Sequence, residues 1–170
     1  MRKIYFMLLL AIVSLTASAQ KGDLSVGLKG GYISYYKDGL YGMDLSYHLT
    51  DPFEVAFTGI FNPKTSLKND ITNKVNDFAI YSANLDLRMY LLAQRTWAMG
   101  PALGGQYLIV NSSTDNLLDT KVLGFNMGWH IRANVTDNIK ANGGWRYTNA
   151  KEDLSHHYFY LGVAYTFQTY

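Results

Sequence analysis

The chain has 170 residues, a formal net charge of +2 and no cysteine. This length suits one domain, the small net charge argues against a nucleic-acid partner, and the lack of cysteine excludes disulfides, thiol catalysis and a lipid-acylated cysteine. With 14 Tyr and 15 Gly but only 3 Pro, the composition favours strands and tight turns over helices.

The first residues of the chain have the features of a secretory signal peptide. Two cations are followed by a ten-residue apolar stretch at 4–13, and small residues precede a predicted cleavage between Ala19 and Gln20. A membrane anchor is the alternative, but ten apolar residues are too few to span a bilayer as a helix. We therefore expect a signal peptide at 1–19 and a single exported domain at 20–170.

Apolar and polar residues then alternate with the period of two that is typical of strands. The pattern predicts eight strands, which in chain order are 24–35, 40–49, 53–61, 78–92, 97–109, 123–135, 139–147 and 157–167. Most are longer than the five or six residues usual in soluble sheets. Pro101 interrupts the fifth of them and predicts a local irregularity there.

Short and long polar connections alternate between these segments. Three connections are tight turns of about three residues, at 50–52, 93–95 and 136–138. Three others are longer and are predicted to be exposed loops, at 62–77, 111–121 and 148–156. This alternation is typical of an up-and-down barrel whose two ends face different compartments.

The two faces of the predicted strands differ in size as well as in polarity. One face carries bulky aliphatic and aromatic residues with almost no charge, and the other carries glycine, alanine and most of the charges. An eight-stranded barrel has little interior room, so small side chains belong inside. The charged, glycine-rich face is therefore predicted to point inward and the bulky face outward, which is stable in lipid but not in water.

Strand length and closure agree with a membrane setting. About ten residues tilted near 45° cross the hydrocarbon core, and a closed barrel leaves no unpaired backbone edge in lipid. Aromatic residues also gather near the strand ends of the outer face, as in interfacial girdles. We predict an all-β fold, an eight-stranded antiparallel up-and-down transmembrane β-barrel with short periplasmic turns, longer extracellular loops and both termini periplasmic.

In these features the chain resembles the small eight-stranded outer-membrane barrels of the OmpA/OmpX type, from about Gly22 to Tyr170. Its final residues, VAYTFQTY, resemble the aromatic C-terminal signal by which the assembly machinery recognises that family. Phe167 lies three residues before the end and Tyr170 is last, so the resemblance leaves open which aromatic is recognised. It implies the outer membrane of a Gram-negative bacterium, with outer-membrane lipid and the barrel-assembly machinery as partners.

The predicted interior carries titratable side chains of both signs. Since an unpaired buried charge is costly, these groups are expected to pair. They are Lys29, Asp44, His48, Glu54, Asp86, Arg88, Arg132, Lys140 and Arg146. We interpret them as a salt-bridged network that stiffens the barrel, and a narrow path for water or ions is the alternative.

Ser46, His48 and Glu54 have the residue types of a hydrolase triad. Barrel enzymes that deacylate lipid A, however, place the histidine two residues before the serine, at a lipid-facing site near the outer leaflet. Here the order is reversed, the predicted face is inward and the predicted site lies near the periplasmic turn at 50–52. A cross-strand pair of His48 and Glu54 is therefore the simpler interpretation, and we predict no catalytic site.

The sequence also offers little for a metal or a cofactor. His156 and His157 are adjacent in a predicted strand and point to opposite faces, so they do not readily chelate one ion. No glycine-rich phosphate loop, paired-cysteine site or HExxH motif is present. We expect neither a metal nor a cofactor.

These observations predict a non-enzymatic outer-membrane barrel that supports the envelope or presents its loops to an extracellular ligand or protein. A narrow channel for small solutes is the alternative, and a lipid-modifying enzyme or a soluble lipocalin-like carrier is less favoured. Because a fold does not determine a function, this step rests on analogy.

Overall fold

The computed structural model describes residues 22–34, 38–68, 75–93, 96–112, 120–150 and 155–167, with side chains except at 64–68, 75–78 and 112. The strands are β1 (Leu24–Ile33), β2 (Asp38–Thr50), β3 (Phe53–Lys68), β4 (Val75–Met89), β5 (Leu92–Ala93), β6 (Trp97–Ser112), β7 (Thr120–Asn134), β8 (Ile139–Asn149) and β9 (His156–Phe167). Among the described residues, no helix is long and apolar enough to cross a membrane.

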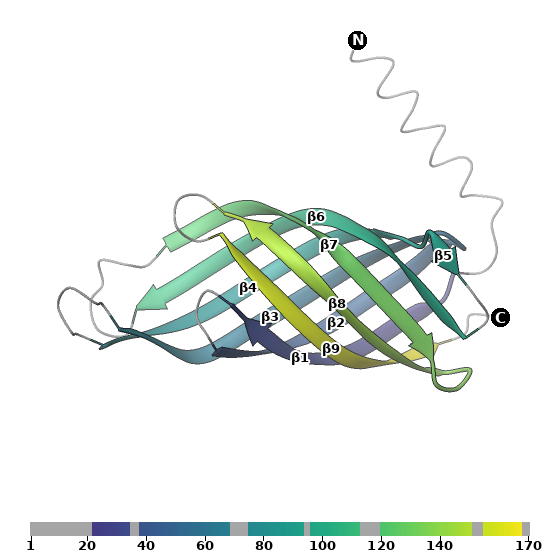
Figure 1. Ribbon diagram of the computed structural model, residues 1–170, viewed down its shortest axis with the longest axis horizontal. Coiled ribbons are helices and arrows are strands. Elements are labelled where there is room, and N and C mark those ends of the chain that lie inside the picture. Colours follow the sequence, from purple (N-terminus) through teal and green to yellow (C-terminus); the bar gives the residue numbers. More distant parts are fainter. Residues whose placement is uncertain are drawn as a thin grey trace, which may run out of the picture.

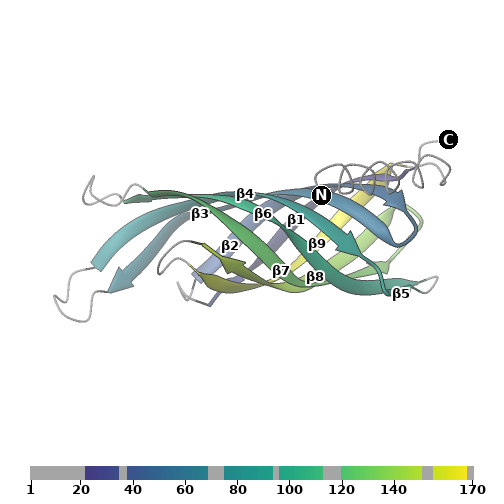
Figure 2. The same cartoon turned by 90° about the horizontal axis from the view of Figure 1, so that it is seen from above.

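The eight long strands form a closed antiparallel barrel, which confirms the predicted fold (Figure 1). Each long strand pairs with its neighbours in the chain, and β1 pairs with β9 to close the ring. β5 is a strand of two residues that follows β4 in the chain and, like β4, pairs with β6. The strands run obliquely to the long axis in both views (Figures 1 and 2), as closure of a sheet into a barrel requires.

The two ends of the barrel differ in their connections. The turn end carries the connections at 51–52, 90–96 and 135–138, and the loop end carries those at 34–37, 69–74, 113–119 and 150–155. Backbone hydrogen bonds from His48 to Asp23 and from Thr166 to Asn138 place the start of β1 and the end of β9 at the turn end. That this end faces the periplasm remains a prediction.

The predicted loops at 62–77, 111–121 and 148–156 are too long, because the strands continue into them. β3 and β4 pair as far as Lys68 and Val75, and β6 reaches Ser112 before β7 begins at Thr120. Backbone pairing with a neighbouring strand does not require apolar side chains, so polar residues extend the hairpins. The β3–β4 register shifts between Asn62 and Thr65. Pro63 lies in this interval, and a proline has no backbone N–H to donate to the neighbouring strand.

Pro101 disturbs only one side of β6. The ladder with β7 continues through it, with Pro101 opposite Trp129. On the other side the β4 ladder ends at Ala102, and pairing resumes with β5 at Met99 in a register shifted by one residue. The irregularity predicted at this proline therefore lies in the pairing with β4 and β5.

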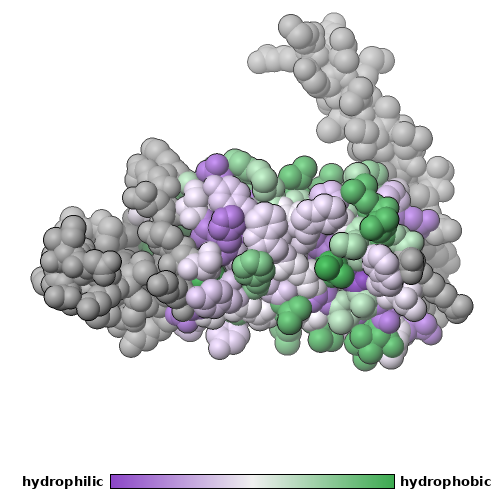
Figure 3. Space-filling model, viewed as in Figure 1, coloured by the Kyte–Doolittle hydropathy of each residue, from purple (hydrophilic) through white to green (hydrophobic). Residues whose placement is uncertain are grey.

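The bulky face of the strands points outward. In β2, exposed and buried residues alternate from Leu40 to Tyr47, and side chains such as Leu123 and Leu161 are 78% and 76% exposed. Apolar and weakly polar residues predominate on the visible wall of the barrel (Figure 3). So much exposed apolar surface is unfavourable in water and favourable against lipid.

The interior is filled in two layers, one of which the sequence did not predict. The layer nearer the turn end is polar, with glycines such as Gly128, where an added Cβ would collide with the carbonyl oxygen of Trp145. The layer nearer the loop end, here called the apolar layer, consists of Ile33, Leu40, Ile60, Ile80, Leu108, Val110, Ala150, Tyr158 and Tyr160, with Val122 packed against it. The predicted charged interior therefore occupies only part of the barrel.

The predicted signal peptide and its predicted cleavage site lie outside the described residues, and so does Tyr170. We expect the protein isolated from outer membranes to begin at Gln20, because small residues lead up to that bond. Intact-mass spectrometry checks this, and the control Ala19→Arg should block cleavage and retain residues 1–19. Retention of those residues in the wild-type protein would contradict the assignment.

Candidate functional site

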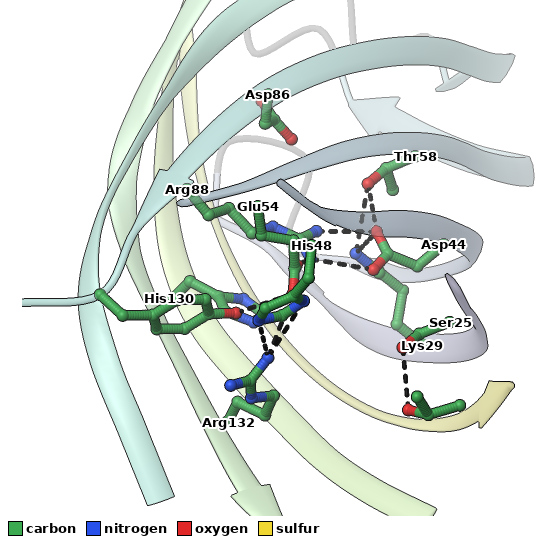
Figure 4. Close-up of polar contacts among 12 residues, drawn as sticks. Ser25, Lys29, Asp44, His48, Glu54, Thr58, Asp86, Arg88, His130 and Arg132 are labelled. Atoms are coloured by element: carbon green, nitrogen blue, oxygen red, sulfur yellow. Dashed lines mark hydrogen bonds and ion pairs between the residues drawn. The ribbon is translucent and has the colours of Figure 1, made fainter. Parts of the chain in front are cut away.

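The nine titratable side chains predicted for the interior all lie inside the barrel wall, in three groups. The central group joins Lys29, Asp44, His48, Glu54, Arg88 and Arg132. Arg146 pairs with Asp86, and Lys140 lies 3.8 Å from Asp23, which is not one of the predicted interior residues. The central group is shown in Figure 4.

Asp44 on β2 binds two cations. Lys29 Nζ donates to Asp44 Oδ1 at 2.8 Å. Arg88 donates through Nη2 to Oδ1 at 2.8 Å and through Nη1 to Oδ2 at 3.1 Å, a two-pronged contact that the planar guanidinium favours. The Thr58 hydroxyl, opposite Asp44 on β3, donates to Oδ1 at 2.6 Å. These bonds fix a carboxylate that is 4% exposed.

Glu54 on β3 is the second carboxylate of the central group. Arg88 Nη1 donates to Glu54 Oε1 at 2.6 Å, and the Tyr90 hydroxyl donates to Oε2 at 3.1 Å. His48 lies directly opposite Glu54 in the β2–β3 register, and its Nδ1 is 3.1 Å from Oε2. Arg88 is thus shared between Glu54 and Asp44, and it is only 1% exposed.

The contacts of His48 define its tautomer. Arg132 Nη1 lies in close contact with His48 Nε2. Arg132 Nη1 is also 3.4 Å from Nδ1, but Nδ1 faces Glu54; because a guanidinium only donates hydrogen bonds, the arrangement fits a ring that accepts at Nε2 and donates from Nδ1 to Glu54. The ring is therefore neutral in this arrangement, and both of its nitrogens are in use.

Arg146 and Asp86 form a separate pair across the interior, from β8 to β4. Arg146 Nη2 is 2.5 Å from Asp86 Oδ2, although neither carboxylate oxygen has a well-directed hydrogen bond within the described residues. The guanidinium also faces the rings of Tyr158 and Tyr160, at 5.3 and 5.9 Å from their centroids. Aromatic faces add cation–π attraction to the ion pair.

Sequence reasoning missed the neutral members of the interior. Asn126 donates to Asn84 Oδ1 at 2.9 Å and accepts from the Thr148 hydroxyl at 2.9 Å, which links β4, β7 and β8. His130 Nδ1 is 2.9 Å from the hydroxyl of Tyr160, whose ring also lies 4.7 Å from Lys29 Nζ. The inward position of each follows from the alternation, but of the neutral side chains only His48 was predicted to belong to the network.

The remaining sequence candidates do not meet at this site. Ser46 is buried on β2, whereas both nitrogens of His48 are directed at Arg132 and Glu54. Phe167 is on the outer face and 50% exposed, and its role as an assembly signal remains a prediction.

The two adjacent histidines lie on opposite faces of β9. His156 is buried, and the outward His157 stacks on Trp145 with ring centroids 5.7 Å apart. Within the described residues, no group of three or more His, Cys, Asp or Glu is placed to hold a metal ion.

Comparison with known families identifies the barrel. The family described as the outer membrane protein beta-barrel domain matches residues 6–167. The chain belongs to this family. Its outward apolar surface is therefore lipid-facing, in the outer membrane of a Gram-negative bacterium. A comparison with curated proteins found no match.

Several solved structures of outer-membrane barrels are similar to this one. OprG of Pseudomonas aeruginosa has a TM-score of 0.66 at 12% identity, covering 89% of this chain and 98% of its own. The N-terminal barrel domain of P. aeruginosa OprF gives 0.58 at 16%, covering 88% and 100%. Ail, the attachment invasion locus protein of Yersinia pestis, in complex with the heparin analogue sucrose octasulfate, gives 0.57 at 15%, covering 87% and 100%. At these identities the likeness concerns the fold alone.

Proposed function

We propose that this protein is a non-enzymatic, closed outer-membrane barrel that supports the envelope and presents its loop end to the exterior. The observation that carries the proposal is that side chains fill the interior in two successive layers. A barrel whose interior is filled in this way has a rigid wall and two ends available for contact, and the filling obstructs the passage of solutes.

The polar layer obstructs the interior because some of its contacts cross from one wall to another. Arg132 on β7 reaches His48 on β2 and lies 3.4 Å from Glu54 on β3. Arg146 on β8 reaches Asp86 on β4, and in neither case are the two strands neighbours in the sheet. These bridges are expected to hold opposite walls together.

The apolar layer adds a second obstruction, nearer the loop end. Leu40, Ile80 and Leu108 on three different strands are at most 2% exposed, so little water reaches them. An ion that crosses such a layer loses hydration and gains few polar partners, which is costly. This layer argues against the narrow-channel alternative.

Two further points support the proposed role. Neither His48 nitrogen remains for a Ser46 nucleophile, which removes the base from the triad considered above. The strands β3, β4, β6 and β7 have 15 or 16 residues each, and their long hairpins lead to the loop end. An extracellular ligand or protein would bind at this end. Ail, whose fold is similar, was solved with a heparin analogue, so ligand binding is compatible with this architecture.

We expect the purified, folded protein to produce no single-channel conductance in planar lipid bilayers. The physical reason is the continuous filling of the interior by the two layers. A general porin from the same preparation serves as the positive control, and boiled protein serves as the negative control. Reproducible conductance steps from the folded protein alone would overturn the proposal and favour a channel for small solutes.

A further inference from the structure

The turn end of the barrel contains a polar cavity that the proposed scaffold role does not use. It has a volume of about 450 Å³, within the range of small-molecule sites. His48, Arg132 and Lys140 line it, with side chains between 9% and 17% exposed, so they lie deep. We call this cavity the vestibule. Asp23, Asp51 and Asp137 line it as well and are more exposed, so they form its rim.

The charges around the vestibule do not balance at its floor. Three cations, Lys29, Arg88 and Arg132, share the two carboxylates of the central group, Asp44 and Glu54. Arg132 makes the longest of these contacts, at 3.4 Å, and it is the member that lines the cavity. His48 is neutral by its hydrogen bonding and adds no charge. Within the described interior, the surplus positive charge of the central group therefore lies at Arg132.

Lys140 strengthens this surplus. Its nearest carboxylate is that of Asp23, 3.8 Å away, and Asp23 is 40% exposed. Such a loose and partly hydrated pair neutralises the ammonium only weakly. The floor thus combines a guanidinium and an ammonium, and the planar fork of arginine matches the two oxygens of a carboxylate.

The rim restricts which anion fits. Asp23, Asp51 and Asp137 oppose the entry of negative charge, and the penalty grows with the charge of the ligand. Because the three rim carboxylates outnumber the two floor cations, each further negative charge on a ligand adds net repulsion, so a monoanion is favoured over a phosphate dianion. We propose that the vestibule binds a small monocarboxylate, with its carboxylate on Arg132 and Lys140. This site is independent of the scaffold role, since a closed barrel binds such a ligand at its mouth without transporting it.

The test is a titration of the isotope-labelled protein, folded in detergent micelles, followed by backbone amide chemical shifts. Sodium acetate represents a small free carboxylate, and N-acetylalanine represents the carboxyl end of a peptide. Saturable shifts at Asn134, Thr136 and Lys140 are expected with one or both, and their relative affinities distinguish the two sources. Inorganic phosphate is expected to bind more weakly than either.

Matched variants make the test specific. Arg132→Gln is expected to weaken carboxylate binding about tenfold or more, as loss of a charged hydrogen-bond partner does. Lys140→Gln should also weaken it and provides a second test if the Arg132 variant fails to fold. Asp51→Asn on the exposed rim should strengthen binding, because it removes repulsion. Lys121→Gln is the control, since this exposed residue lies on β7 opposite Ile109, away from the turn end.

Three results would overturn the proposal. They are the absence of saturable shifts with both carboxylates in the wild-type protein, phosphate binding as tight as carboxylate binding, and unchanged affinity in both the Arg132 and Lys140 variants. None of them would alter the expected lack of conductance, so the vestibule and the closed barrel are tested separately.

Discussion

Replacing Arg88 with methionine is expected to lower the free energy of unfolding by about 3–5 kcal/mol, the usual effect of removing one partner from a buried ion pair. Arg88 is 1% exposed and donates to both Asp44 and Glu54. Without it, two buried carboxylates share fewer cations, and neither is accessible enough to be hydrated. Urea unfolding of the protein in lipid vesicles, followed by tryptophan fluorescence, measures the change.

Arg132→Met is the matched control for this prediction. Arg132 is 17% exposed and lies 3.4 Å from Glu54, so its removal should cost clearly less than that of Arg88. If the two variants lost equal stability, Arg88 would not be the centre of the network. The shift in mobility between unboiled and boiled protein on a gel verifies that each variant still forms a barrel.

The isolated pair of Asp86 and Arg146 tests whether the loss comes from uncompensated charge. Either Asp86→Asn or Arg146→Met alone leaves a buried charge whose opposite charge at 2.5 Å has been removed. The double variant removes both charges and should be more stable than the sum of the two single losses predicts. Strictly additive losses would mean that the two residues act independently.

The second large effect is expected on the outer face. Leu161→Arg should destabilise the barrel by about 2–4 kcal/mol, because a charge near the middle of a lipid-facing strand is moved into hydrocarbon. Leu161 lies midway along β9 and is 76% exposed. At an equally exposed site in a soluble protein, the same change would alter stability by about 0.5 kcal/mol or less. Unfolding in vesicles provides the measurement.

Val135→Arg is the control for the outer-face prediction. Val135 is 64% exposed but lies in the 135–138 connection at the turn end, outside the strands. Charges near the interface cost about 0–1 kcal/mol, so this variant should be nearly neutral. Equal and small effects at both positions would mean that the outer face does not contact lipid, as in a soluble carrier.

The part of the candidate site that was predictable is the part formed locally. His48 and Glu54 face each other near the Asp51–Pro52 turn because the register shifts by one residue between Thr50 and His48, which gives the pairing expected of a turn centred on Asp51. Arg88 lies opposite Glu54 on β4, but its contact with Asp44 crosses β3 to reach β2. That contact depends on how three strands are staggered, and alternation along one strand carries no information about stagger.

Contacts across the interior are even harder to predict from the sequence. Arg132 meets Glu54, and Arg146 meets Asp86, only because the curvature of the closed ring brings β7 across the interior from β3 and β8 across from β4. Pairing of β1 with β9 determines this arrangement, and strand closure is a property of the whole ring. The vestibule likewise combines residues from both ends of the chain, from Asp23 to Lys140.

By itself, the sequence determined the fold class, the number of long strands and which face of each strand meets lipid. The physical reason is that these depend on the two-residue period and on side-chain size, both of which are local. Only the tertiary structure decided where the strands end, which charges pair and where the apolar layer lies. The alternation along each strand places Ile33, Leu40 and Ile80 on the inner face. They form one layer because the pairing of the strands aligns them at the same height in the closed barrel.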